Sequence, residues 1–265
     1  MLLDIGGWHS KYDIMKNLHI TYVDPEKIEQ NLDHNTQQVI ALLKKFHVPV
    51  RIVGGAVRDM LLGKKPRDID LVADVDPAVL IYIFDSHDIP VDYGGIIHGT
   101  VKAVFGHGNQ QQKVDVSSLG YRIKRHGHSL DILGTHNWRK DSLMRDITIN
   151  SMSMDQQGKV YDYQTGLHDL KHQIVRMCEH SRDAMILDPN GIMRYFKAIS
   201  MFPHAHVIKS DLDFIAKNVH LLADVADDER VQMNLLSILR SPNKKHVQNL
   251  MCALHLDKYL PFVEC

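Results

Sequence analysis

The sequence has few cysteines and no long apolar run. Its three cysteines, Cys178, Cys252 and Cys265, have neither zinc-ligand spacing nor the density of a disulfide framework. We therefore expect three reduced thiols and a cytoplasmic protein. The N-terminal segment has no basic region ahead of a long apolar stretch, and no later run is long enough for a membrane span. From these absences we expect no signal peptide and no membrane contact.

An excess of charge of either sign is also missing. The formal net charge of the 265 residues is −1 and the isoelectric point is near 7. A globally basic nucleic-acid-binding surface is therefore not indicated, and any RNA contact must come from local patches. The chain also has no internal repeat and no low-complexity run, so it has the composition of a globular protein with one large domain or two modest ones. Its oligomeric state is not indicated.

What is present is concentrated in residues 51–72, RIVGGAVRDMLLGKKPRDIDLV. A β-branched run ends at Gly54-Gly55, and a short amphipathic segment follows until Gly63 ends it. Glycine between a strand and a helix N-terminus lets an anion approach the backbone, and the free N–H groups of the helix favour phosphate. Arg58, one turn later, could reach the same anion with a forked donor. The pattern predicts a phosphate site, and the alternative is a tight turn without a ligand.

The same stretch ends with two aspartates. In a strand, alternate residues face the same side, so Asp68 and Asp70 would project together while Ile69 and Leu71 face inward. Paired carboxylates bind hard divalent cations, above all Mg²⁺. An Asp-x-Asp on a solvated loop is the alternative. A phosphate site and a metal pair in one short unit together suggest nucleotidyl transfer.

This combination resembles a known family signature. Class II CCA-adding enzymes and bacterial poly(A) polymerases carry Gly-Gly-x-Val-Arg-Asp-x-Leu-Leu-Gly, then Pro and Asp-x-Asp, and all these positions are matched between Gly54 and Asp70. The resemblance implies an α+β fold, with a mixed sheet and flanking helices in a nucleotidyltransferase head and a small all-helical neck and body after it. It also implies two Mg²⁺ ions. The implied reaction adds CMP and/or AMP from CTP or ATP to an RNA 3′ end, chiefly the CCA end of tRNA.

A third carboxylate follows in the head. One helix is expected from Asp24 to about Lys45, another over 77–87, and then a hairpin of strands 100–105 and 113–118. Alternation places Asp115 with Ser117 on one face. If this strand lies beside the Asp68–Val72 strand, Asp115 becomes a third metal ligand, and otherwise it is a solvated edge residue. The family has an acidic residue in a similar strand, which favours the first reading.

Residues 121–138 are rich in Gly, His, Lys and Arg. We expect a mobile, solvated surface loop here, which is similar to the family arrangement. In this loop Lys124, Arg125 and His126 are candidate contacts to the RNA backbone, and such contacts would be salt-sensitive.

A second landmark is residues 141–154, DSLMRDITINSMSM. Asp141 is expected to cap a helix, with Arg145, Asp146 and Asn150 on a polar stripe. Family members carry Arg-Arg-Asp-x-Thr-x-Asn here and use it to contact the triphosphate and sugar of the nucleotide. This chain matches the motif from Arg145 onward, but Met144 replaces the first Arg. The alternative for the Arg-Asp pair is a structural ion pair.

The third landmark is residues 187–197, LDPNGIMRYFK. Family members have Glu-Asp-Pro-x-Arg-x-x-Arg, in which the Asp and first Arg read the base edge. Asp188 and Arg194 align with the Asp and the second Arg, whereas Leu187 and Gly191 replace the Glu and the base-reading Arg. The choice between CTP and ATP therefore stays open. Other readings are a register with Arg194 and Lys197 as the two arginines, or a plain helix capped by Asp188.

The predicted organisation is an N-terminal extension and helix (1–47), a catalytic head (48–155), a neck with the base-binding region (156–200) and an abbreviated helical body (201–265) with helices over 210–222, 227–239 and 243–255. Related enzymes continue further, into domains that hold tRNA. Three other functions remain open: tailing of other RNAs in the manner of a poly(A) polymerase, nucleotidyl transfer to a protein or small molecule, and an inactive RNA-binding descendant.

Overall fold

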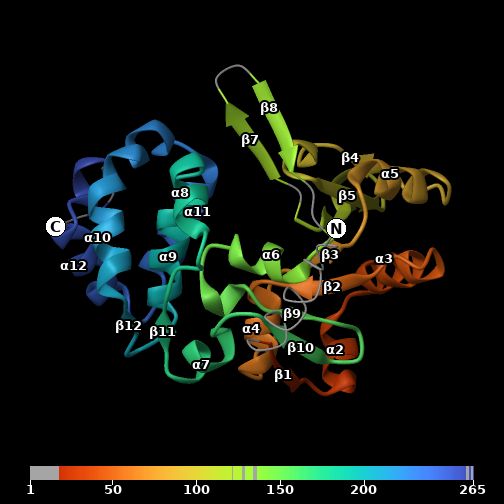
Figure 1. The fold of residues 1–265 in the computed structure, drawn as a ribbon, viewed down its shortest axis with the longest axis horizontal. Helices are drawn as coiled ribbons and strands as arrows, with labels where there is room; N and C mark the ends of the chain where they lie inside the picture. Colours follow the sequence, from red (N-terminus) through yellow and green to blue (C-terminus); the bar gives the residue numbers. More distant parts are fainter. Residues whose placement is uncertain (1–17, 121, 127–128, 134–135, 261–262, 264) are drawn as a thin grey trace, which may run out of the picture. The chain divides into compact units, whose positions relative to one another are not determined.

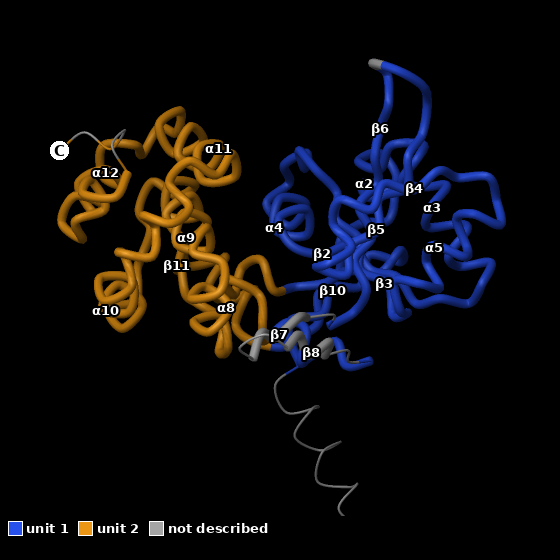
Figure 2. Tube along the Cα trace, turned by 90° about the horizontal axis from the view of Figure 1, so that it is seen from above, with its two compact units in different colours: residues 1–142, 152–163 blue, residues 143–151, 164–265 orange. Residues whose placement is uncertain are grey.

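The computed structural model describes residues 18–120, 122–126, 129–133, 136–260, 263 and 265 (Figure 1). The chain forms two compact units (Figure 2). Unit 1 comprises Met1–Ser142 and Met152–Tyr163, and unit 2 comprises Leu143–Ser151 and Gln164–Cys265. The chain therefore leaves unit 1, returns to it and leaves it again.

Unit 1 is built on a mixed eight-stranded sheet in the order β1-β10-β9-β2-β3-β6-β5-β4. Only the β3–β6 pair is parallel, because the chain crosses from β3 through α5, β4 and β5 before β6. This sheet confirms the predicted mixed α+β head. Its strands are β1 (His19–Tyr22), β2 (Val50–Val53), β3 (Asp70–Ala73), β4 (Val91–Asp92), β5 (Thr100–Phe105), β6 (Gln112–Ser118), β9 (Ser153–Met154) and β10 (Lys159–Asp162).

The helices of unit 1 are α2 (Pro25–Asn31), α3 (His34–Lys45), α4 (Gly55–Leu61), α5 (Pro77–Asp85) and α6 (Trp138–Leu143), which ends at the unit boundary, with short 3₁₀ turns at Ile96–His98 and Gly108–Gln110. The single helix expected up to Lys45 was wrong. Asp33 accepts hydrogen bonds from the backbone N–H (2.9 Å) and the hydroxyl (2.9 Å) of Thr36, and so caps a new helix. The hairpin prediction was confirmed, since β5 and β6 pair from Thr100↔Ser117 to Phe105↔Gln112.

The loop expected over 121–138 was also wrong. Two antiparallel strands, β7 (Arg122–His126) and β8 (Ser129–Leu133), form a separate sheet within it, in the register Arg122↔Leu133 (Figure 1). Asp141 does not cap a helix either, because it lies inside α6 and its buried carboxylate accepts from the N–H of Gly120 (3.2 Å). Asn137 makes the capping bonds instead, to the N–H groups of Arg139 and Lys140.

Unit 2 is mainly helical, as predicted, and also contains a small parallel sheet of β11 and β12. Its helix α11 packs against α9, and α12 packs against both. Cys252 and Cys265 form a disulfide, so the expectation of three free thiols was wrong for these two, whereas buried Cys178 is free. The elements of unit 2 are η3 (Thr148–Asn150), α7 (Gly166–Lys171), β11 (Ile174–Val175), α8 (Ser181–Leu187), α9 (Asn190–Ser200), β12 (His206–Val207), α10 (Lys209–Asn218), η4 (Val219–Val225), α11 (Glu229–Leu239), α12 (Lys244–Ala253) and η5 (Leu256–Lys258).

Candidate functional site

The glycine pair of unit 1 lies directly beside Asp70. Strands β2 and β3 are antiparallel with Val53 opposite Asp70, so Gly54 leaves β2 next to that carboxylate. A Cβ at Gly54 would lie 3.9 Å from Asp70 Oδ2, and its φ of +72° is one that L-residues with a side chain rarely adopt. Helix α4 begins at the following residue. The backbone conformation at position 54, beside the carboxylate, therefore favours glycine.

Arg58 folds back over the start of α4. Its Nη2 lies 3.2 Å from the position that a Cβ at Gly55 would take. The same guanidinium donates from Nε to Asp59 Oδ1 (2.9 Å). The Arg58 side chain is largely buried. Its charge is thus held at the helix N-terminus, where the sequence predicted an anion site.

The two aspartates of the Asp-x-Asp motif are both exposed. Asp70 is the first residue of β3, whereas Asp68 precedes the strand, so the prediction of a strand from residue 68 was wrong. Asp68 has a side chain that is 82% exposed and lies 3.9 Å from the Nε of Arg67. Ile69 is partly buried and Leu71 is buried, as the alternation predicted.

Asp115 lies on the strand next to Asp70. Strands β3 and β6 are parallel with Leu71 opposite Val116, and one step back in this register Asp70 faces Asp115. The predicted neighbourhood of the two strands is therefore confirmed. Asp115 also has a partner that the sequence did not reveal, since the Nζ of Lys102 lies 3.0 Å from its Oδ2.

The three aspartates line one cavity of about 640 Å³ in unit 1. Its lining is strongly polar and comprises Gln30, Asn31, Leu32, Asp33, Thr36, Lys65, Pro66, Arg67, Asp68, Ile69, Asp70, Lys113, Val114 and Asp115. Within the described residues, no group of three or more His, Cys, Asp or Glu side chains is close enough to hold a metal ion. Carboxylates in an open polar cavity nevertheless suit Mg²⁺, which takes one or two carboxylates and completes its shell with water and phosphate oxygens.

Unit 2 brings three of the predicted nucleotide-binding residues into one ion-pair network. Arg194 on α9 donates from Nε to Asp146 Oδ2 (2.9 Å) and from Nη1 to Asp188 Oδ2 (3.4 Å). The residue Asp146 lies between α6 and η3, and Asp188 ends α8. The helix expected to carry Arg145, Asp146 and Asn150 ends earlier, at Leu143, so no helical stripe exists there. Arg145 and Asn150 are partly buried.

Arg230 on α11 is a further member of this network, and sequence reasoning missed it. Its Nη1 lies 3.3 Å from Asp188 Oδ2, and its Nη2 lies 2.7 Å from Asp228 Oδ2. The hydrogen bonds from Arg230 lower the pKa of Asp228, and the bond to Asp228 raises the pKa of Arg230. No local pattern could have identified Arg230, because its contact with Asp188 spans 42 residues.

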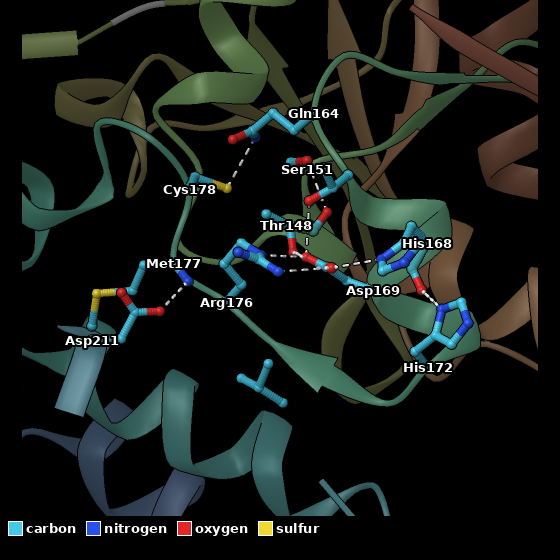
Figure 3. Close-up of polar contacts among 12 residues, drawn as sticks. Thr148, Ser151, Gln164, His168, Asp169, His172, Arg176, Met177, Cys178 and Asp211 are labelled. Carbon is cyan, nitrogen blue, oxygen red and sulfur yellow. Dashed lines mark hydrogen bonds and ion pairs between the residues drawn. The ribbon is translucent and has the colours of Figure 1, made fainter. Parts of the chain in front are cut away.

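The polar motif around Thr148 is anchored by a buried carboxylate, as Figure 3 shows. Asp169 on α7 accepts from the hydroxyl of Thr148 (2.7 Å) and from Nε of Arg176 (3.0 Å), and Thr165 and His168 donate to it as well. Burial alone would raise the pKa of Asp169, but these hydrogen bonds outweigh it and the pKa lies below its ordinary value. Thr148 of the family motif therefore has a structural role in unit 2.

The two departures from the third motif differ in their surroundings. Leu187 is exposed at the end of α8. Gly191 is buried in the first turn of α9, and a Cβ there would lie 2.6 Å from Met185 Cγ and 3.5 Å from Arg194 Nη2. Met185 and Arg194 thus fill the space in which a side chain at position 191 would begin. Asp188 is not an N-cap, since Pro189 takes that position without a side-chain capping bond.

The tentative RNA contacts Lys124, Arg125 and His126 lie on β7. Their side chains fall outside the described part of the chain, so the prediction for them is untested.

Comparison with known proteins shows what the head resembles. Residues 50–176 match the family model described as the poly A polymerase head domain. The human mitochondrial CCA tRNA nucleotidyltransferase 1 is 32% identical over 223 residues, which cover 83% of this chain and 50% of that protein. The CCA-adding enzyme of Ligilactobacillus salivarius is 30% identical over 88% of this chain and 57% of its own length. The chain thus spans about half the length of the curated relatives it matches.

A solved structure has a similar fold. The Bacillus stearothermophilus CCA-adding enzyme in complex with CTP superposes with a TM-score of 0.69 and 25% identity, over 88% of this chain and 55% of that one. Among the helices in the described ranges, none is both long and apolar enough for a membrane crossing. The human relative is named as mitochondrial, and the cytoplasmic location expected for this chain stays a prediction.

Proposed function

Since residues 50–176 of this chain match the family model described as the poly A polymerase head domain, we propose that the chain is a template-independent RNA nucleotidyltransferase. It transfers CMP and/or AMP from CTP or ATP to the 3′ end of an RNA and releases pyrophosphate. The CCA end of tRNA is the proposed acceptor, because the matched relatives are named as CCA-adding enzymes.

One observation carries the proposal: Asp68, Asp70 and Asp115 line a single polar cavity beside Gly54. Hard oxygen ligands of this kind would hold Mg²⁺, with Asp68 and Asp70 as the principal pair, Asp115 as a further ligand and two ions as the expected number. When bound, Mg²⁺ would lower the pKa of the attacking 3′-hydroxyl and stabilise charge on the leaving pyrophosphate. The carboxylates themselves would orient the reacting groups.

The residues proposed for the nucleotide fall into two groups. In unit 1, Gly54 and Gly55 allow phosphate oxygens to approach the backbone, and Arg58 supplies a positive charge at the start of α4. In unit 2 the proposed contacts are Arg145 to the triphosphate and Asn150 to the sugar, with Asp146, Asp188 and Arg194 in the base region. The acceptor oxygens of Asp188 and the donors of Arg194 can pair with an amino group and a ring nitrogen, which cytosine and adenine both present.

The test is RNA extension by the purified protein with Mg²⁺ and each nucleoside triphosphate in turn, on tRNA that lacks CCA. Sequencing of the 3′ ends should show added C and A residues and no added G or U. Extension by A alone on any RNA would instead indicate a tailing enzyme of the poly(A) polymerase type. Mass spectrometry that finds AMP or CMP on protein or a metabolite, with no RNA extended, would contradict the proposal.

A further inference from the structure

We infer that the ammonium group of Lys102 competes with a divalent cation for the carboxylate of Asp115, and that the Lys102–Asp115 ion pair breaks when the cation binds. This inference rests on the proposed metal site and adds a residue that sets its affinity. The ammonium group and a metal ion are attracted to the same carboxylate, and Lys102 already occupies its Oδ2. Lys102 would therefore hold Asp115 in place in the metal-free protein and weaken metal binding by the amount that breaking the pair costs.

The pair is fixed by the sheet. Lys102 on β5 and Asp115 on β6 are directly opposed partners, and the Nζ of Lys102 lies 3.0 Å from Asp115 Oδ2. The next pair on the same face, Thr100 and Ser117, is joined through its hydroxyl groups (2.8 Å). Cross-strand neighbours on one face have short Cβ separations, so the ammonium group reaches the carboxylate without a long-range rearrangement.

The carboxylate that Lys102 holds lies on β6, the strand that pairs with the Asp70 strand β3. Asp70 and Asp115 face each other in the parallel β3–β6 register, and both line the cavity. The side chains of Lys102 and Asp115 are only 30% and 37% exposed, so water screens their contact less than it would screen a fully exposed pair. A divalent ion carries twice the charge of the ammonium group, which gives it the advantage at high metal concentration.

A matched control exists on the same hairpin. Lys113 on β6 lines the cavity itself and pairs with Asp92 (Nζ–Oδ2 2.5 Å) instead of Asp115. This contact is the main cause that lowers the pKa of Asp92. Removal of Lys113 deletes the same charge and the same kind of ion pair from the same sheet, where it joins β6 to β4 instead of β5 to β6. Comparison of Lys102→Met with Lys113→Met therefore distinguishes direct competition at Asp115 from a general change in the electrostatic potential of the cavity.

The experiment measures Mn²⁺ binding by electron paramagnetic resonance of the free ion, without nucleotide or RNA. Lys102→Met should bind Mn²⁺ about fivefold more tightly than the wild type, the upper range for a partly exposed ion pair. Lys113→Met and Lys102→Arg should each stay within about twofold. The gain from Lys102→Met should vanish when Asp115 is changed to Asn. Circular dichroism checks folding, and Lys102→Gln replaces the Met variant if that variant does not fold.

The outcomes separate this inference from the proposed function. If the wild type binds Mn²⁺ and Asp70→Ala does not, the metal site stands. Equal affinities for Lys102→Met and the wild type, or equal gains for Lys102→Met and Lys113→Met, would then overturn the competition by Lys102 alone. If neither the wild type nor Lys102→Met binds Mn²⁺, the metal site and the competition fall together.

Discussion

The guanidinium of Arg194 lies 2.9 Å from the carboxylate of Asp146, a contact that spans 48 residues. The same Arg194 reaches Asp188, which Arg230 also contacts. Asp146, predicted from the second motif, and Asp188 and Arg194, predicted from the third, thus form one electrostatic unit that is joined through the guanidinium of Arg194.

Arg194→Ala tests this unit. The largely buried Asp146 carboxylate would lose its charged donor, so the free energy of unfolding should fall by about 1–3 kcal/mol. Arg230→Ala breaks the bond to the same Asp188 oxygen but leaves Asp146 paired, and should cost less than about 1 kcal/mol because Arg230 is 56% exposed. Chemical denaturation measures both. Equal losses would show that the Asp146 contact contributes little.

Gly54→Ala should impair activity more than stability alone explains. Gly63 has a similar φ (+68° against +72°), but a Cβ there would meet nothing within 4 Å, whereas at Gly54 it would lie beside Asp70. Gly63→Ala should lose about 1–2 kcal/mol of stability through backbone strain, and Gly54→Ala, with a ψ of −139° outside the left-handed helical region, about 1–3 kcal/mol. Only Gly54→Ala should also weaken Mn²⁺ binding and nucleotidyl transfer. Equal activity of the two variants would argue against a role for the Gly54 backbone at the site.

Asp169 should make unit 2 sensitive to acid. Its pKa is below the ordinary value, so its contribution to stability is fully present above the unfolded-state pKa and is lost as the pH falls through the folded-state pKa. At pH 7 Asp169→Asn should cost about 3 kcal/mol, because it leaves the Arg176 charge without its partner. The cost should shrink towards about pH 3. Denaturation across this pH range is the measurement.

The exposed Asp213, which pairs with Lys209, supplies the control. Asp213→Asn should change stability by less than about 0.5 kcal/mol at any pH, since an exposed i,i+4 pair contributes little. A cost for Asp169→Asn that grows with acidity would contradict the assigned direction of the pKa shift.

The effect of Gly191→Ala on the free energy of unfolding should depend on the side chain at position 185. The added Cβ would lie 2.6 Å from Met185 Cγ, so overpacking should destabilise the protein by about 1–3 kcal/mol. In a Met185→Ala background the same change should cost clearly less, because the space is free. A double-mutant cycle of unfolding free energies measures the difference. Additive costs would show that Met185 does not fill the space beside Gly191.

The sequence predicted the elements whose signals are local. Alternation located the β5–β6 hairpin to within one residue. The strands that carry Asp70 and Asp115 are neighbours in the sheet, as expected. It could not reveal Arg230 or Lys102, because their contacts depend on which elements pack together. The sequence does contain a signal for the helix that begins after Asp33, since Asp33 and Thr36 have the spacing of an N-cap and its third helical residue. The apolar stripe runs through this position without interruption, and so it predicted one helix instead of two.

The pairing of Cys252 with Cys265 is another contact that spacing alone did not indicate. The hairpin of β7 and β8 was missed because its composition, rich in Gly, His and charged residues, is typical of loops. In both cases the error came from composition, which reports average tendencies and not the partner of a given residue.

The central claim is that Asp70 serves metal-dependent nucleotidyl transfer, and its most direct test is the single-turnover rate of CMP or AMP transfer to tRNA lacking CCA, measured against Mg²⁺ concentration. The wild-type rate should rise from zero and saturate, and Asp70→Asn should lower it on the order of a hundredfold or more. Asp92→Asn, which alters a half-buried carboxylate paired with Lys113, should leave the rate nearly unchanged. Transfer that proceeds without a divalent ion, or equally well in Asp70→Asn, would contradict the account.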